Sequence, residues 1–366
     1  MGQYLNSLPT EIKQYFRILS SDFPDWLEDY IITPEMLRLK GISMNCGLDY
    51  TNCFDIKYWY SNLEHSVGVA LILWNFTHDK KQTLAGLFHD IATPVFKHCI
   101  DFMNGDSLRQ ESTEEKTGEI IRNSKQIMEL LTRDNIAVEE VEDYKMYSLA
   151  DNETPGLSAD RFEYTFSSGL VFQRVWSLEK IKQVYENIKV GINEKKEQEF
   201  IFQSKSVCED YVKIIAPLWH AWISPADRTC MQFIADLCKS MKNFGFLTVD
   251  DLYQLSEEEL IQRIKNCPND YIQKSFAKFQ NTTSVIESIY PLDDKYSVHV
   301  EVKKRYILPL VYVNNQLLRI HHVSEGAYQE YQKLMAVNFD GYTSLDFDFQ
   351  PIKPNEMTLK RTKKEE

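Results

Sequence analysis

Four of the eight histidines of this chain fall within the 34 residues from His65 to His98. His65 lies in the apolar stretch LEHSVGVALILWNF, and His89 lies in the next apolar stretch, KQTLAGLFHDIATPVFKH, directly before Asp90. Both stretches carry apolar residues at helical intervals, so we predict two helices joined by the turn THDKK. A helical hairpin of this kind can bring the start of the first helix next to the end of the second.

Such a hairpin would gather the types of side chain from which protein metal sites are assembled, namely imidazoles and carboxylates from separate helices. Burying His89 and Asp90 at the end of an apolar helix costs free energy unless a partner satisfies them. A metal cation is such a partner, because it keeps the imidazole neutral and the carboxylate ionised. Further along, Asp160 and Arg161 place two charges at the head of an aromatic helix, LSADRFEY.

Each of these residues also has a simpler interpretation. His65 taken alone is more often a partly buried histidine with an ordinary hydrogen bond than a metal ligand. A second His-Asp pair, His78–Asp79, falls in the turn itself, where side chains are solvated, and we assign it no function. The spacing of all four ligand-type residues, rather than any one of them, favours a metal site.

The composition excludes several classes of protein. With 43% hydrophobic and 26% charged residues, the chain reads as an ordinary globular protein. A net charge of −13 disfavours a protein that grips nucleic acid by its phosphates, although an anionic small molecule needs only a few local cations. No apolar run approaches the roughly 20 residues that cross a bilayer, so we expect no membrane segment. The N-terminal residues show no signal-peptide pattern.

The seven cysteines are odd in number and form no CxxC pair. This pattern disfavours a disulfide framework or a zinc ribbon, and we expect a reducing cytoplasm.

Helical periodicity dominates the chain as far as about residue 290, where the sequence becomes rich in Val, Ile and Tyr. We therefore predict a mainly α fold, a helical bundle with a small C-terminal α/β appendage. The predicted parts are a helical domain (1–240), a helical extension packed on it (241–290), a small antiparallel sheet plus helix (291–350) and a disordered tail (351–366). The sheet is expected to turn at Asn314–Asn315, and GINEKKEQEF is expected to be an exposed hairpin turn.

Three motifs resemble those of one branch of the HD superfamily of metal-dependent phosphohydrolases, the deoxynucleoside triphosphate triphosphohydrolases and their bacterial relatives. LEHSVGVA resembles the EHSLGV of that branch, AGLFHDIATPVFKHCID is similar to AGLCHDLGHGPFSHMFD, and LSADRFEY is similar to DVDKWDY or DADRLDY. The resemblance runs from about Arg38 to Tyr312 and is strongest between His65 and Tyr164. It implies that residues 1–240 form an HD-type helical catalytic domain.

The resemblance also implies a ligand set: His65, His89, Asp90 and Asp160 would hold a divalent ion. That ion would be Fe, Mn, Co, Ni or Zn, or else Mg, and the sequence does not choose among them. Such an ion would lower the pKa of a water molecule and polarise a phosphorus centre.

Further roles follow from the same match. His98 and Asp101 correspond to residues that handle protons. Arg161 and Tyr164 correspond to residues that touch the substrate's phosphates, and a surface arginine and a core tyrosine are the alternatives. Lys97 either adds positive charge to the mouth of the site or is solvated.

Glu64, next to the first ligand, either orients that ligand or lies on the helix surface.

The chain departs from the branch in the residues around the ligands. Thr93 and Thr113 stand where the branch has histidines, Asn62 stands where it has an arginine, and Phe166, Ser167 and Ser168 replace its Ala-Arg-Asp. Losing two arginines that pair with a triphosphate removes interactions that are each worth a few kcal/mol. Either the substrate is less charged than a deoxynucleoside triphosphate, or other cations replace the two missing arginines. Candidates for those cations are Arg122, Arg174, Arg228 and Lys303–Lys304–Arg305.

The sequence therefore favours a metal-dependent phosphohydrolase that acts on a nucleotide or a similar phosphate ester. One alternative is a phosphodiesterase acting on a cyclic or oligonucleotide messenger. Another is a nucleotide-binding sensor or interaction protein that kept the metal site and lost turnover. A homo-oligomer is expected from the resemblance.

Overall fold

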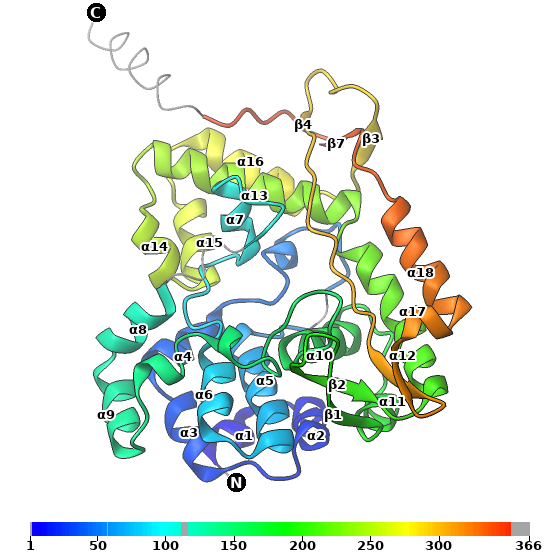
Figure 1. Cartoon of the computed structure of the whole chain (residues 1–366). Coiled ribbons are helices and arrows are strands. Elements are labelled where there is room, and N and C mark those ends of the chain that lie inside the picture. The colour runs from blue at the N-terminus through cyan, green and yellow to red at the C-terminus, as the bar shows by residue number, and fades with distance from the viewer. Residues whose placement is uncertain (1, 57, 111–115, 353–366) are drawn as a thin grey trace, which may run out of the picture.

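Figure 1 shows the computed structural model of the chain, which describes residues 2–56, 58–110 and 116–352. The fold is mainly α, as predicted, with two small sheets. The helices are α1 (Gln3–Ser7), α2 (Thr10–Leu19), α3 (Asp25–Ile31), α4 (Pro34–Arg38), α5 (Asn62–Thr77), α6 (Lys80–Phe88), α7 (His98–Met103), α8 (Thr117–Asn123), α9 (Lys125–Arg133), α10 (Ala159–Ser167), α11 (Leu178–Tyr185), α12 (Lys205–Ala221), α13 (Pro225–Asn243), α14 (Val249–Gln254), α15 (Glu257–Lys265), α16 (Asp270–Gln280), α17 (Ile320–Val323) and α18 (Glu325–Ala336). The strands are β1 (Ile188–Ile192), β2 (Gln198–Phe202), β3 (Ile286–Ser288), β4 (Tyr296–Val298), β5 (Leu310–Val313), β6 (Gln316–Arg319) and β7 (Tyr342–Leu345).

The predicted helical hairpin is confirmed as α5 and α6. Ser61 begins α5 with a capping box, in which its hydroxyl accepts from the Glu64 amide and the Glu64 carboxylate accepts from the Ser61 amide. Residues 62–73 of α5 are all buried, as expected of a helix that is apolar on every side. Between the helices, His78 caps α5 in a left-handed conformation and Asp79 caps α6, so the His78–Asp79 pair builds the turn.

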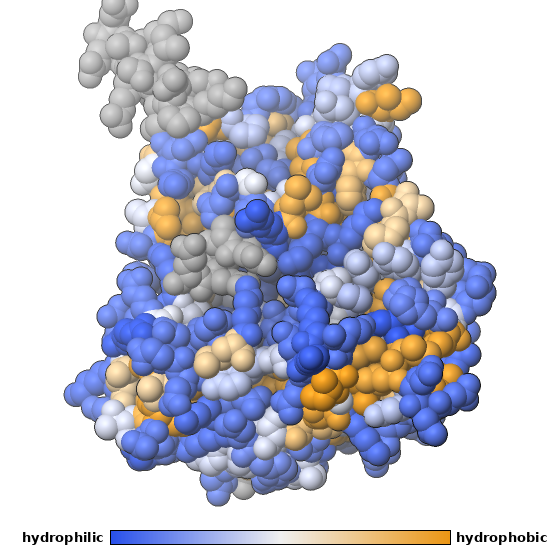
Figure 2. Space-filling view, viewed as in Figure 1, coloured by the Kyte–Doolittle hydropathy of each residue, from blue (hydrophilic) through white to orange (hydrophobic). Residues whose placement is uncertain are grey.

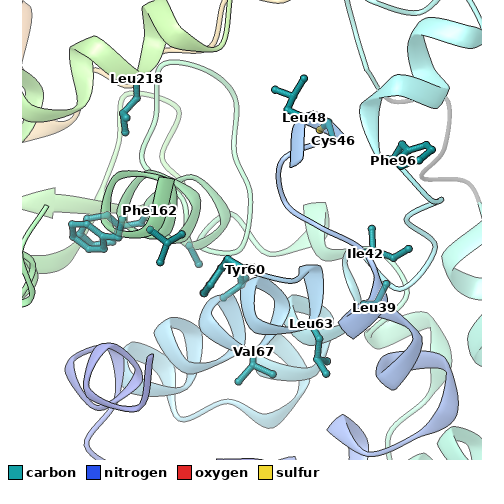
Figure 3. Packing of buried hydrophobic residues seen from close by; sticks show 14 of the residues in the cluster. Leu39, Ile42, Cys46, Leu48, Tyr60, Leu63, Val67, Phe96, Phe162 and Leu218 are labelled. Carbon is teal, nitrogen blue, oxygen red and sulfur yellow. The ribbon is translucent and has the colours of Figure 1, made fainter. Parts of the chain in front are cut away.

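Helix α5 is central because α2, α4, α6 and α10 all pack against it. Figure 3 shows part of the buried cluster around this helix: Tyr60, Leu63 and Val67 of this region, Phe162 of α10, and Ile42, Leu48 and Phe96. The buried apolar residues form one cluster that runs from Tyr4 to Phe349. This cluster includes residues from all three of the expected domains, and the boundaries at 240/241 and 290/291 remain predictions.

The C-terminal strands are divided between two sheets, where one was expected. One sheet has the order β1-β2-β5-β6, in which β5 pairs in parallel with β2 from the body of the chain. The other has the order β3-β7-β4. The two expected turns are confirmed: the β1–β2 hairpin lies in GINEKKEQEF, and β5 and β6 meet at Asn314 and Asn315, both with positive φ.

Residues 299–309 explain the difference. This segment was expected to be strand, but the chain between β4 and β5 forms no sheet ladder. Figure 1 shows it running past the helical body from one sheet to the other. Its backbone is tied to other loops, because Lys303 N donates to Ser107 O at 3.3 Å and Leu308 N donates to Pro155 O at 2.9 Å. Residues 299–309 therefore do not pair as a strand and instead lie over part of the helical body.

No helix in the described ranges is long and apolar enough to cross a membrane. All seven cysteines are free, as the sequence predicts. The tail expected to be disordered, 351–366, lies outside the described residues except for Pro351 and Ile352.

Candidate metal centre

Three of the four expected ligands converge from separate elements: His65 from the first turn of α5, His89 from the end of α6, and Asp160 from the first turn of α10. Nε2 of His65 lies 3.2 Å from Nε2 of His89 and 3.1 Å from Oδ1 of Asp160. Nε2 of His89 lies 3.6 Å from the same oxygen. Both imidazoles are buried.

These separations fit ligands around one metal ion. With metal–ligand bonds of about 2.0–2.2 Å, neighbouring ligand atoms of a tetrahedral or octahedral ion are about 2.8–3.6 Å apart. The donor set of two imidazole nitrogens and a carboxylate oxygen suits a divalent transition metal. The residues present therefore fit the ion that the sequence led us to expect.

The two imidazoles are held so that Nε2 points to the shared centre. His89 Nδ1 lies 2.7 Å from the carbonyl oxygen of Gly86, one turn earlier in α6, and therefore donates to it. His65 Nδ1 pairs with the Glu163 carboxylate on α10. Metal-binding histidines are usually fixed in this way, with the second ring nitrogen bonded to a carbonyl or a carboxylate.

Glu163 is fully buried and is held by several donors besides His65. Tyr60 and Tyr15 donate to its Oε1 at 2.7 and 3.1 Å, and Ser167 donates to its Oε2 at 3.1 Å. Helix α5 approaches it closely, since a Cβ on Gly68 would lie 2.7 Å from the Glu163 side chain. The carboxylate is thus fixed on every side, and with it the orientation of His65.

Asp90, the fourth expected ligand, lies slightly farther out. Its Oδ2 is 3.6 Å from His89 Nε2 and 3.9 Å from His65 Nε2. The same oxygen is 2.9 Å from Nζ of Lys97, so the carboxylate is shared between the centre and a buried ammonium group.

Lys97 also donates to the side chain of Asn62. Asn62 is the first residue of α5, so Lys97 connects the start of that helix to Asp90. Phe96 and Lys97 both have positive φ, an unfavourable conformation for residues with a side chain, and the loop holds it where Lys97 reaches Asp90.

The local charges keep the acids of the centre ionised. Burial alone would raise the pKa of Asp160, but hydrogen bonds from His65 and His89 outweigh it and hold that pKa well below the usual value. Burial is likewise outweighed at Asp90, whose pKa is lowered by Lys97 and then by the two histidines. Burial would lower the pKa of His65, but the charge of Glu163 and the contact with Asp160 raise it to about 9.

His98, which lines the same cavity, pairs with Asp101. His98 Nδ1 lies 2.9 Å from Oδ2 of Asp101, which is fully buried, and burial lowers the pKa of His98. On the other side of the ring, Arg305 Nη2 donates to His98 Nε2 at 3.2 Å. The histidine therefore lies between an acid of its own helix and an arginine from 299–309.

Arg161 and Tyr164 both line the cavity. The guanidinium of Arg161 is occupied by the loop before α10: it bonds the backbone carbonyls of Asn152 and Gly156 and the side chain of Asn152, and it lies 3.3 Å from Asp151. Tyr164 packs edge-on against Trp222, and burial raises its pKa to about 12. Arg161 thus fixes the loop that leads into Asp160, and its expected contact with a substrate's phosphates stays a prediction.

Glu64 is not one of the residues that line the cavity. Its carboxylate closes the capping box, with Oε2 accepting from the amide and hydroxyl of Ser61 at 2.6 and 2.7 Å. Both expectations for Glu64 are therefore replaced: it is buried, and its contacts are those of a helix cap rather than those of a residue that orients His65. Thr93 lies in the loop after Asp90, where Arg38 donates to its carbonyl at 2.6 Å, and Thr113 lies outside the described residues.

The cavity around these groups has a volume of about 220 Å³. Of the cations proposed to replace the missing arginines, Lys303 and Arg305 line it, and Arg122, Arg174 and Arg228 do not. Arg122 instead pairs with Glu139 and Glu142 on the surface. Beside the charged groups, apolar side chains cover much of the cavity: Met44, Leu48, Phe102, Phe172, Trp222 and Met231. Figure 2 shows the outer surface of one face of the molecule, which is largely hydrophilic with separate hydrophobic patches.

No protein-family profile matches this chain. Among curated proteins, it is 22% identical over 315 residues to the uncharacterized protein YdhJ of Bacillus subtilis (strain 168), covering 84% of this chain and 92% of that protein. Among solved structures, it matches a phosphohydrolase from Bacteroides thetaiotaomicron VPI-5482 with a TM-score of 0.62 at 11% identity, over 90% of this chain and 97% of that one. A hypothetical protein from Aquifex aeolicus gives a TM-score of 0.61 at 15% identity, over 89% and 93% of the two chains. The chain therefore shares its fold with these structures over nearly its whole length.

The sequence reasoning missed two groups of this site. The sequence indicates only that Glu163 belongs to an aromatic helix. Its position three residues after Asp160 places both acids on one helix face, and this spacing could have predicted that Glu163 lies near the metal ligands. Gln110, which receives Arg305 at 2.5 Å, carries no signal in the sequence, because its partner lies 195 residues away.

Proposed function

We propose that this chain is a metal-dependent phosphohydrolase that hydrolyses a phosphate ester or anhydride of a nucleotide. The observation that carries the proposal is the convergence of His65, His89 and Asp160, with Asp90 beside them, on one point of a cavity. Two further facts support it: the fold is shared with a phosphohydrolase, and the motifs resemble those of the deoxynucleoside triphosphate triphosphohydrolases.

The cavity is suited to a phosphorylated substrate. A divalent ion held by the four ligands would act as a Lewis acid on a phosphoryl group and would lower the pKa of a nearby water. Lys97 and Arg305 both line the cavity and bring positive charge to it. Glu163 keeps His65 Nε2 turned toward the cavity, and Asp101 fixes the ring of His98, whose Nε2 accepts from Arg305 and would be able to take up a proton once that bond is broken.

The decisive experiment combines metal analysis with a substrate panel. The purified chain is loaded with Mn, Fe, Co, Ni, Zn or Mg and incubated with nucleoside mono-, di- and triphosphates and cyclic dinucleotides, and the products are identified by mass spectrometry. We expect metal-dependent release of phosphate, pyrophosphate or triphosphate. His89→Ala should lose both the metal and the activity, whereas His78→Ala, a histidine of the α5–α6 turn, should lose neither.

The other outcomes distinguish the alternatives. Cleavage of cyclic dinucleotides without cleavage of linear nucleotides would identify a phosphodiesterase. Metal binding without any hydrolysis would identify a sensor. A chain that binds no divalent metal under any of these conditions would refute the proposal.

A further inference from the structure

Arg305 enters the cavity from the segment 299–309. One nitrogen of its guanidinium, Nη2, donates to Gln110 Oε1 at 2.5 Å and to His98 Nε2 at 3.2 Å. Arg305 therefore touches the cavity wall through neutral acceptors supplied by two other parts of the chain.

Arg305 differs in its partners from two other cations of the cavity, Lys97 and Arg161, which each lie beside a carboxylate. Lys97 lies 2.9 Å from the Asp90 carboxylate, and Arg161 lies 3.3 Å from that of Asp151. Within residues 2–56, 58–110 and 116–352, Arg305 forms no ion pair with a carboxylate. A guanidinium bound only by neutral groups keeps its full charge available to an anion.

One acid, Asp227, lines the cavity near Arg305, and it does not cancel this charge. Burial raises the pKa of Asp227 to about 8, although Arg305 opposes the shift. The shift favours the neutral form of the carboxyl group, and among the described residues Asp227 forms no ion pair with Arg305.

The contact also fixes the state of His98. A guanidinium can donate hydrogen bonds but cannot accept them, so Nε2 of His98 must be the acceptor. The ring proton then lies on Nδ1, which donates to Asp101 at 2.9 Å. His98 is thus a neutral imidazole whose lone pair is covered by Arg305.

We propose that Arg305 is a substrate-binding residue whose guanidinium moves from His98 to the phosphoryl oxygens of the substrate and thereby frees Nε2 of His98 to accept a proton. Arginine pairs with two phosphate oxygens at once, which makes a phosphoryl group a better partner than a single imidazole nitrogen. The inference rests on the proposed function, and it makes the C-terminal segment part of the substrate site.

The test uses the full chain, free of metal and loaded with zinc, and inorganic phosphate as the probe. Calorimetry measures phosphate affinity for the wild type, Arg305→Gln, Arg305→Lys and the surface control Arg122→Gln. Losing the charged hydrogen bonds should weaken phosphate binding and raise KM about 10- to 100-fold in Arg305→Gln. Arg305→Lys, which keeps the charge and loses the fork, should fall between Arg305→Gln and the wild type, and Arg122→Gln should match the wild type.

A second variant leaves Arg305 untouched. Gln110→Glu replaces the neutral acceptor by a carboxylate of the same shape, so it should hold the guanidinium and weaken phosphate binding even if Arg305→Gln does not fold. The ¹⁵N resonance of His98 Nε2, assigned with His98→Gln, should shift when phosphate is added to the wild type and remain unchanged in Gln110→Glu.

The outcomes separate this inference from the proposed function. Wild-type phosphate affinity and KM in both Arg305→Lys and Gln110→Glu would overturn the role of Arg305 while leaving hydrolysis in place. Arg305-dependent phosphate binding in a chain that hydrolyses nothing would support the role of Arg305 and remove the proposed function.

Discussion

Glu163→Gln is the sharpest test of how the metal centre is built, because it changes one atom of a fully buried side chain. In the native chain, Oε2 of Glu163 accepts from Nδ1 of His65 and from Ser167. An amide that keeps its oxygen toward Tyr15 and Tyr60 would present an NH₂ group to His65 Nδ1. Two donors cannot pair, so the imidazole would shift its proton to Nε2, the nitrogen that faces the other ligands.

The size of the effect follows from this change. Removing a carboxylate that supports a metal-binding histidine costs about 10- to 100-fold in metal affinity. That loss corresponds to about 1.4–2.7 kcal/mol of binding free energy. The buried mismatch should also lower the free energy of unfolding by about 1–3 kcal/mol, since buried donors lose a charged acceptor.

The assay is a chelator competition with zinc on the folded chain, with thermal unfolding measured in parallel. Glu257→Gln is a matched control, because Glu257 is also fully buried but accepts from the Ser43 amide at 2.9 Å and does not line the cavity. Its metal affinity should equal that of the wild type. A Glu163→Gln chain that folds and binds zinc within twofold of the wild type would refute the reasoning.

Four further predictions follow from single contacts. The pKa of His65 is raised to about 9, so in the metal-free chain the stability from its protonated form is complete below about pH 6.5 and is lost as the pH rises through 9. Zinc must displace that proton, and its affinity should rise over the same pH range in a competition assay. The pKa of Asp227 is raised to about 8, so the chain should lose stability as the pH rises from about 4 to 8, and Asp227→Asn should flatten that slope in urea unfolding. Lys97→Met frees Asp90 from its ammonium partner and should tighten zinc binding while making the metal-free chain less stable to heat. Ser61→Ala removes the side-chain cap of α5 and should cost about 1 kcal/mol in urea unfolding with little effect on zinc affinity.

The sequence determined the elements closest to the candidate site. Apolar periodicity and the THDKK turn predicted the α5–α6 hairpin, and Asn314–Asn315 predicted the turn between β5 and β6. These features succeed because capping, turn conformation and helical burial act between residues a few positions apart. The same local signals placed His65, His89 and Asp160 at helix ends, where the structure has them.

Tertiary structure decided which other groups meet these three residues. Glu64 and Glu163 each lie next to or near a ligand in the sequence, yet Glu64 closes a helix cap and Glu163 holds His65. Which of the two glutamates contacts His65 depends on how α5 and α10 are rotated about their axes, and the packing of α5 against α10 sets that rotation.

The C-terminal segment shows the same limit most clearly. Its β-type composition predicted one sheet, but the strands are divided between two sheets. Residues 299–309 between them lie over the helical body and bring Arg305 to His98, which is 207 residues away in sequence. A composition pattern reports how a segment can pair locally. Such a pattern does not indicate which distant part of the chain the segment will contact, because packing of the whole helical body decides that contact.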